Sequence, residues 1–145
     1  MIHLETIGPE NWRMGLHVSA SQKFFVADDM RLLARAYAYR EHRSCALLIY
    51  ADAVAVGMAL YHDCEALNAY DFSQIFIDER YQGQGYGTAA AAQILARMKN
   101  DGRFDKVVLC YIEGNDAARN MYLKLGFYHT GDRDENEIIM EKKLR

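Results

Sequence analysis

The residues with the clearest chemical potential form a glycine-rich segment, Gln-Gly-Gln-Gly-Tyr-Gly-Thr, at positions 82–88. The apolar stretch 72–77 before it predicts a strand, and the alanine-rich stretch 89–98 after it predicts a helix. Glycines let the backbone approach a ligand and adopt positive φ. The first N–H groups of a helix lack partners within the helix and attract anions. The segment therefore predicts a cradle for a diphosphate, such as that of a nucleotide cofactor.

The spacing of the glycines excludes two common phosphate loops. Thr88 stands where the dinucleotide pattern G-x-G-x-x-G requires its third glycine, and the chain has no Gly-Lys pair for a P-loop. What remains is Gln82-x-x-Gly85-x-Gly87, and a plain strand-to-helix turn can also carry such a short motif.

A second pattern follows a predicted strand at residues 106–111. Asn115 is a favourable N-cap, Asp116 and Lys124 suit the first and last turns of a helix, and Gly126 suits the position just beyond it. The sequence predicts a short helix with sharp boundaries at this place.

Together these motifs resemble those of the GCN5-related N-acetyltransferase (GNAT) superfamily. Gln82-x-x-Gly85-x-Gly87 is similar to its Q/R-x-x-G-x-G/A signature, and Asn115-x-x-Ala118-x-x-x-Tyr122 is similar to its second cofactor motif. The resemblance implies acetyl-CoA as the cosubstrate, with Asn115 on the pantetheine arm and Tyr122 facing the thioester sulfur. It also implies that the backbone of residues 75–77 pairs with the pantetheine amides. The residues expected to bind the cofactor are Ile75, Phe76, Ile77, Gln82, Gly83, Gln84, Gly85, Tyr86, Gly87, Thr88, Asn115, Arg119 and Lys124. For Arg119 and Lys124, a solvated surface charge is an equal alternative.

Further segments resemble the diamine and polyamine acetyltransferases within the superfamily. These are residues 18–27, 33–37, 56–61, 75–78, 81–83 and 125–131. Two places depart from those relatives. Relatives usually carry an arginine and an aromatic residue before the Ile-Asp pair, where this chain has Ser-Gln-Ile-Phe at residues 73–76. The run from Ile112 to Asn115 reads Ile-Glu-Gly-Asn instead of Glu-Pro-Glu-Asn. Both departures lie where the acceptor and the base would be.

Direct transfer, as the resemblance implies, requires a neutral amine. Deprotonating an alkyl amine of pKa ~10.4 at pH 7 costs roughly 4–5 kcal/mol, so some group or water chain must accept that proton. We expect Tyr122 to protonate the leaving sulfur, although its helix position also allows core packing. Asp71 or Glu113 could be the base, and either could equally be a solvated strand-end charge.

Two further acidic residues and one cysteine have alternative interpretations. Asp63 and Glu65 could hold a second ammonium group of the acceptor, or could lie in an exposed turn. Cys110 lies within an apolar strand with no histidine or asparagine near it in sequence, which favours a buried small residue over a covalent nucleophile.

The leading function is an acetyl-CoA-dependent N-acetyltransferase that acts on a primary amine of a small molecule, such as a diamine or polyamine. A peptide or protein amine is the alternative acceptor, and a non-catalytic CoA-binding module is the other alternative. A homodimer is implied by the resemblance.

Composition limits the other classes of protein. The 145 residues suit one domain spanning 1–145, and the 51% apolar content supports a packed core without staples. The net charge of −3 argues against a nucleic-acid partner and permits a cationic substrate. We expect no metal, no membrane span and no signal peptide. Three widely spaced cysteines suggest reduced thiols in the cytoplasm.

The elements predicted along the chain have the order β-α-α-β-β-β-α-β-α-β-β. The two early helices start near residue 9 and near Asp28 or Asp29, and a polar turn at residues 131–136 separates the last two strands. This order predicts an α/β (α+β) protein with a mixed central sheet and helices on both faces. The resemblance implies the GNAT fold, in which that sheet is mostly antiparallel.

Overall fold

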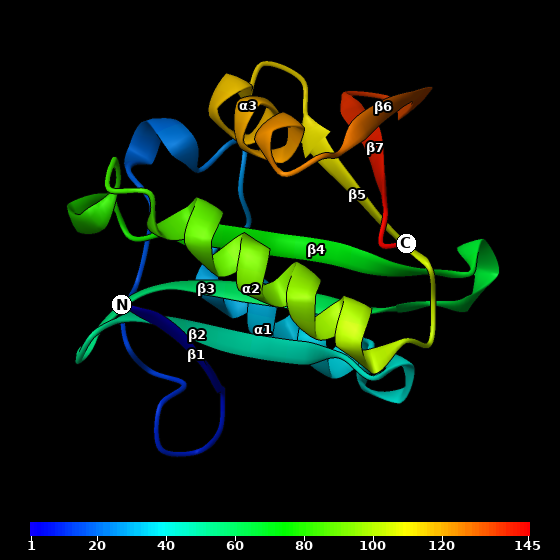
Figure 1. Ribbon diagram of the computed structural model, residues 1–145. Helices are drawn as coiled ribbons and strands as arrows, with labels where there is room; N and C mark the ends of the chain where they lie inside the picture. The colour runs from blue at the N-terminus through cyan, green and yellow to red at the C-terminus, as the bar shows by residue number, and fades with distance from the viewer.

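The computed structural model describes residues 1–145 and contains one seven-stranded sheet with three α-helices (Figure 1). The strands are β1 (Ile2–Thr6), β2 (Cys45–Ala51), β3 (Val54–Cys64), β4 (Ala69–Ile77), β5 (Lys106–Ile112), β6 (Tyr128–Asp134) and β7 (Glu137–Lys143). The helices are α1 (Asp29–Ala38), α2 (Tyr86–Asp101) and α3 (Asp116–Lys124).

The sheet has the strand order β1-β2-β3-β4-β5-β7-β6. All neighbouring strands are antiparallel except β4 and β5, which are parallel. This arrangement confirms the mixed, mostly antiparallel sheet. The β4–β5 pairing is short, with only Tyr70 opposite Val107 and Asp71 opposite Val108. Beyond these pairs the two strands diverge, as Figure 1 shows.

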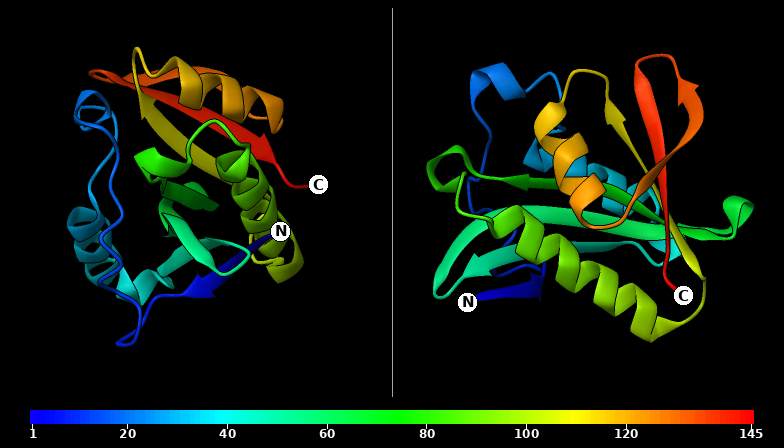
Figure 2. Two further views of the ribbon diagram at one scale, coloured as in Figure 1. Left: turned by 90° about the vertical axis from the view of Figure 1, so that its left-hand side faces the viewer. Right: turned by 45° about the horizontal axis from the view of Figure 1, so that its top comes forward.

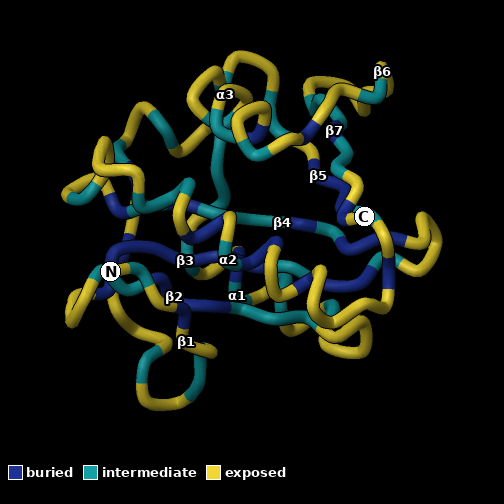
Figure 3. Tube along the Cα trace, viewed as in Figure 1, coloured by how far each residue is buried: buried dark blue, intermediate teal, exposed yellow.

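Helices cover both faces of the sheet, as predicted. α2 and α3 lie on one side and α1 on the other, which the two views of Figure 2 make clear. Two hydrophobic clusters fill the two interfaces. The larger contains Ala90, Ile94 and Met98 of α2, and the smaller contains Leu32 of α1. Burial is concentrated along β2, β3 and β4 and decreases toward β6 at the sheet edge (Figure 3).

Local signals in the sequence set the helix boundaries. Asp28 caps α1 by accepting a hydrogen bond from the Arg31 N–H at 2.8 Å. Asn115 caps α3 by accepting from the Ala118 N–H at 3.3 Å, as predicted. No helix combines the length and the apolar composition that crossing a bilayer would need.

Two local predictions were wrong. Residues 9–13 form turns instead of a helix, so α1 is the only α-helix before β2, preceded by a single 3₁₀ turn at Ala20–Gln22. The Asn11 side chain explains the difference, because it accepts from the Gly8 N–H at 2.7 Å and donates to the Thr6 carbonyl, which closes the chain locally. In addition, β6 continues through Gly131 to Asp134, so the turn before β7 is shorter than predicted.

Candidate active site

The divergence of β4 and β5 opens the main cavity of the molecule. Because β5 leaves β4 after Asp71, the edge of β4 from Phe72 to Ile77 has no strand beside it on that side. Ser73 is an extra residue in the β3–β4 ladder, since Phe72 pairs with Tyr61 while Gln74 pairs with Leu60. Such a bulge changes the direction of neighbouring side chains.

A cavity of about 890 Å³ occupies this divergence. It is lined by β4, by the loop before α2, by β5, by α3, and by the segment that leads into α1. Glu137, the first residue of β7, completes the wall.

The glycine-rich segment at residues 82–88, called the glycine loop below, forms one wall of the cavity. Gly83 has φ +81° and Gly85 has φ +80°, and Gly85 is the N-cap of α2. A Cβ built on either glycine would meet no atom within 4 Å, so the backbone faces open space. Gln82 fixes the loop by donating to the Ile77 carbonyl at 2.8 Å and by pairing with the Gln22 side chain. The exposed backbone and the N-terminus of a 16-residue helix fit a diphosphate.

Most of the residues expected to bind the cofactor lie at this cavity. Its lining includes Ile75, Phe76, Ile77, Gln82, Gly83, Gly85, Tyr86, Gly87, Thr88 and Asn115. Gln84, Arg119 and Lys124 are exposed and do not line it. Gln84 instead accepts a hydrogen bond from the Tyr86 hydroxyl at 3.0 Å.

Tyr122 lies in the cavity wall on the buried face of α3. Its side chain is only 7% exposed, and its ring packs edge-on against Phe72 and Phe127. Burial raises the pKa of its hydroxyl well above the usual value. The two interpretations of Tyr122 are therefore compatible, because a packed ring can present a protonated hydroxyl to the cavity.

The two candidate bases have different surroundings. Asp71 lines the cavity with 27% of its side chain exposed, and burial raises its pKa, an effect that His62 and Arg35 partly oppose. Glu113 lies outside the cavity, is 62% exposed and is paired with Arg133 at 3.2 Å. This hydrogen-bonded pair lowers the pKa of Glu113. Only Asp71 combines access to the cavity with an environment that favours taking up a proton.

The structure also brings to the cavity side chains that the sequence did not indicate as site residues, and three of them matter for its chemistry. Arg35 comes from α1, Cys110 from β5 and Glu137 from β7. Cys110 is exposed toward the cavity, so the expectation that it is buried was wrong. Partial enclosure, with Glu137 and Asp71 nearby, raises the pKa of its thiol to about 12, and it is therefore no thiolate nucleophile at neutral pH. No sequence pattern marks Glu137, because only the strand register places it here.

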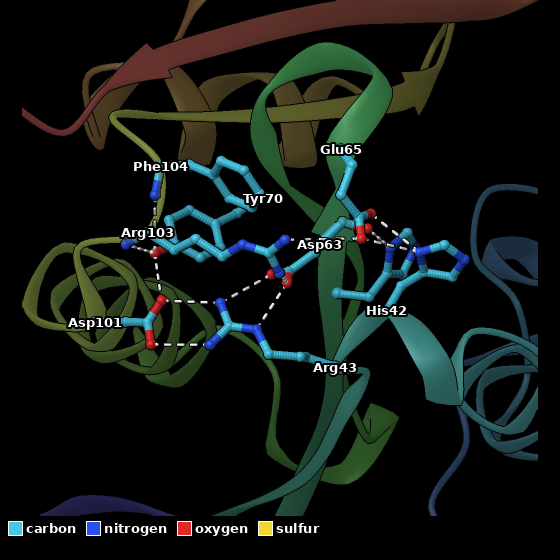
Figure 4. A network of polar contacts seen from close by, with 9 residues as sticks. His42, Arg43, Asp63, Glu65, Tyr70, Asp101, Arg103 and Phe104 are labelled. Carbon is cyan, nitrogen blue, oxygen red and sulfur yellow. Dashed lines mark hydrogen bonds and ion pairs between the residues drawn. The ribbon is translucent and has the colours of Figure 1, made fainter.

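Asp63 and Glu65 do not lie at this cavity. Asp63 is 3% exposed and is held by Arg43 at 2.7 Å and by Arg103 (Figure 4). Arg43 continues the network to Asp101 at 2.9 Å, and Glu65 pairs with His42 at 3.0 Å. Both carboxylates are thus engaged by side chains of the chain itself, and the network links the end of β3 to the end of α2. Neither residue is therefore placed to bind an acceptor in this cavity.

We expect Asp63→Asn to lower the free energy of unfolding by about 1–3 kcal/mol without changing the KM for any amine. The amide keeps the shape but removes the charge that two arginines share. Breaking a buried pair costs about 3–5 kcal/mol, and the partial exposure of both arginines reduces that cost. Urea unfolding and steady-state kinetics measure the two quantities. An amine KM that rises strongly at unchanged stability would return Asp63 to the acceptor site.

With this geometry established, comparisons with known proteins identify the family. A family model described as the Acetyltransferase (GNAT) family matches residues 12–127. The spermine/spermidine N(1)-acetyltransferase of Bacillus subtilis (strain 168) is 28% identical in an alignment 138 residues long that covers 90% of this chain and 90% of that protein.

Solved structures share the fold at lower identity. The spermidine N-acetyltransferase from Vibrio cholerae, in complex with CoA and spermine, superposes with a TM-score of 0.79 at 15% identity, covering 99% of this chain and 95% of that one. The ribosomal-protein-S18-alanine N-acetyltransferase from Escherichia coli gives a TM-score of 0.75 at 18% identity, covering 99% and 94%. With the family model matched from residue 12 to residue 127, the chain belongs to the Acetyltransferase (GNAT) family.

Proposed function

We propose that this acetyltransferase moves the acetyl group of acetyl-CoA to a primary amine of a small molecule, with diamines and polyamines as the first candidates. The observation that carries the proposal is the cavity between β4 and β5, which has the glycine loop, Asp71 and Tyr122 in its wall. The glycine loop follows the end of β4 at Ile77, and Asp71 lies six residues before that end. Roughly 20 Å of strand therefore separates Asp71 from the end of β4 that leads to the loop.

Main-chain groups supply most of the cofactor contacts in this proposal. The loop at Gly83 and Gly85 and the first turn of α2 hold the diphosphate. The free edge of β4 pairs with the amides of the pantetheine arm, as a sheet edge pairs with an extended peptide. A backbone N–H of β4 polarises the thioester carbonyl.

Two side chains transfer protons in this proposal, one as the base and one as the acid. Asp71 takes the proton from the bound ammonium group, directly or through one water, so that the amine can attack. Tyr122 donates a proton toward the leaving sulfur, and its raised pKa keeps it protonated until then. Deprotonating the amine is the larger task, at roughly 4–5 kcal/mol, against about 2 kcal/mol for a thiolate of pKa ~8.5.

The choice of a cationic small molecule has two supports. Asp71 and Glu137 place two carboxylates in the wall of the cavity. The Bacillus subtilis relative, named as a spermine/spermidine acetyltransferase, aligns over 90% of this chain.

A thiol-release assay with acetyl-CoA tests the proposed function. The acceptors are putrescine, spermidine, spermine, lysine, an aminoglycoside and a peptide with a free N-terminus. We expect turnover with a small cationic amine. Turnover of the peptide alone would assign the alternative acceptor, and CoA binding without turnover of any amine would leave a binding module.

Tyr122→Phe is expected to lower kcat by about 10- to 30-fold with little change in the Kd for CoA. The upper limit of this loss is set by the free energy of protonating the leaving CoA thiolate, which at pH 7 is only about 2 kcal/mol. Phenylalanine keeps the ring packing against Phe72 and Phe127, so a lower kcat would report the lost hydroxyl and not lost packing. Single-turnover rates and calorimetry measure the two quantities, and an unchanged kcat would remove Tyr122 as the acid.

Two further predictions concern the whole molecule. We expect a homodimer and a cytoplasmic location. Light scattering during size-exclusion chromatography tests the first, and cell fractionation tests the second.

A further inference from the structure

We propose that His62 is a positioning residue behind Asp71, and that the two side chains form one proton-accepting pair in which Nε2 of His62 receives the proton that Asp71 takes from the acceptor amine. This inference rests on the proposed function and adds a residue to it that does not touch the substrate.

The position of His62 follows from the strand register. His62 on β3 lies directly opposite Asp71 on β4, so both side chains emerge on the same face of the sheet. Nε2 of His62 is 4.0 Å from Oδ2 of Asp71. Asp71 lines the cavity, whereas His62 is only 2% exposed and lies beneath it. An approach of about 1 Å would bring the two atoms to hydrogen-bond distance, and such contacts commonly tighten when substrate binds.

The hydrogen bonds of the ring define its proton state. Nδ1 lies 2.8 Å from the carbonyl oxygen of Asp63. A carbonyl only accepts, so Nδ1 carries a hydrogen, and in the neutral ring Nε2 is then a bare acceptor. Nε2 is buried and has no hydrogen-bond partner. A buried polar atom without a partner calls for an explanation, and this one faces a carboxylate that is also an acceptor. Two facing acceptors are satisfied when one proton lies between them.

The surroundings hold the ring in this orientation. The ring of Tyr39, at the end of α1, stacks on His62 with centroids 4.2 Å apart. The guanidinium of Arg35 lies over the Tyr39 ring, 4.8 Å from the centroid of that ring. The buried Nε of Arg35 also has no hydrogen-bond partner. Stacking fixes the ring plane, and the Nδ1 hydrogen bond fixes its direction.

The other charged and titratable groups near the pair come from each adjoining segment. Arg35 belongs to α1 and Tyr39 directly follows that helix. The ring centroid of His42, in the next turn, lies 5.9 Å from that of Tyr39. On the cavity side, Glu137 of β7 raises the pKa of Asp71, and Asp71 in turn raises that of the Cys110 thiol on β5. None of them makes a hydrogen bond to Nε2 of His62, so Asp71 is the group through which His62 exchanges its proton.

The proton balance is simple. The ammonium group loses one proton to Asp71, which passes it to Nε2 and leaves an imidazolium bonded through Nδ1 to the Asp63 carbonyl. The neutral amine attacks, the carbon–sulfur bond breaks, and the second amine proton replaces the one that Tyr122 gives to sulfur. The imidazolium returns its proton to solvent through Asp71 before the next turnover.

The matched variants are His62→Asn and His42→Asn. An asparagine amide at position 62 can keep the donor to the Asp63 carbonyl while removing Nε2. We expect kcat/KM to fall about tenfold or more and the acid limb of its pH profile to move to lower pH, because an aspartate alone is a weaker base than a pair that includes an imidazole. His42→Asn, an exposed histidine near the same tyrosine, should change neither quantity. A folded His62→Asn protein with an unmoved acid limb overturns the proposal.

A measurement on the wild-type protein does not depend on any variant folding. ¹⁵N NMR of the histidine side chains, at a pH on the activity plateau, should show His62 with its hydrogen on Nδ1 and a bare Nε2. A hydrogen on Nε2 with a bare Nδ1 would overturn the proposal, because that nitrogen could not accept a proton. Failure of the wild-type protein to acetylate any amine would instead reject the proposed function, and the relay with it.

Discussion

Asp71→Asn is expected to lower kcat/KM for the preferred amine by about 10²- to 10⁴-fold, the range over which a positioned general base acts, while leaving the Kd for CoA unchanged. The amide has the same shape but cannot accept the ammonium proton. Asp71 is the candidate base that lines the cavity, and the glycine loop proposed to bind CoA follows the opposite end of β4. Asp71→Asn should therefore lower the rate and leave CoA affinity unchanged in the same variant.

The pH dependence of the wild-type enzyme follows from the environment of Asp71. Burial raises the pKa of its carboxyl above the usual value. Because only the carboxylate accepts a proton, kcat/KM should rise with pH through that raised pKa and then level off. Lowering the pH protonates the pair that Asp71 forms with His62 and removes the base. A profile measured from pH 5 to 9, with the amine concentration well below KM, shows this limb.

Glu113→Gln is the discriminating comparison for this prediction. Glu113 is exposed, paired with Arg133 and outside the cavity. We expect its removal to change kcat/KM less than threefold, which corresponds to under about 0.7 kcal/mol. If Glu113→Gln caused the large loss while Asp71→Asn remained active, the assignment of the base would be reversed.

Gly85→Val is expected to weaken CoA binding about 100-fold or more. A side chain on Gly85 would occupy the open space beside the loop, where the diphosphate is proposed to lie. Losing two backbone hydrogen bonds to a charged group, at about 1.5–3 kcal/mol each, accounts for that factor. Valine at φ +80° is also strained by about 1–3 kcal/mol, which would alter the loop itself.

Gly15→Val separates the two effects. Gly15 has φ +68° with no atom within 4 Å of a built Cβ, and it does not line the cavity. The substitution therefore introduces comparable backbone strain away from the loop. We expect a similar loss of thermal stability in the two variants and a loss of CoA affinity only in Gly85→Val, measured by calorimetry. Wild-type affinity in a folded Gly85→Val protein would place the diphosphate elsewhere.

Prediction from sequence worked best where the signal is local. The caps at Asp28 and Asn115 and the glycines around α2 act on residues only a few positions away, so their types alone indicate where helices begin. The same reasoning failed at residues 9–13, where the proline near a helix start was outweighed by two hydrogen bonds of the Asn11 side chain, which donates to the Thr6 carbonyl and accepts from the Gly8 N–H. Competition between a local cap and a local turn depends on side-chain geometry that the sequence does not display.

The sequence by itself determined the sheet type, the order of the main strands along the chain, and the position of the glycine loop that resembles the family motif, because each depends on short-range periodicity and turn chemistry. Only the tertiary structure decided which carboxylates are free. Asp63 is neutralised by Arg43 and Arg103 from distant parts of the chain, whereas Asp71 is left facing the cavity with His62 behind it. Cross-strand register and the divergence of β4 from β5 produce these neighbours, and both arise from contacts between residues far apart in sequence.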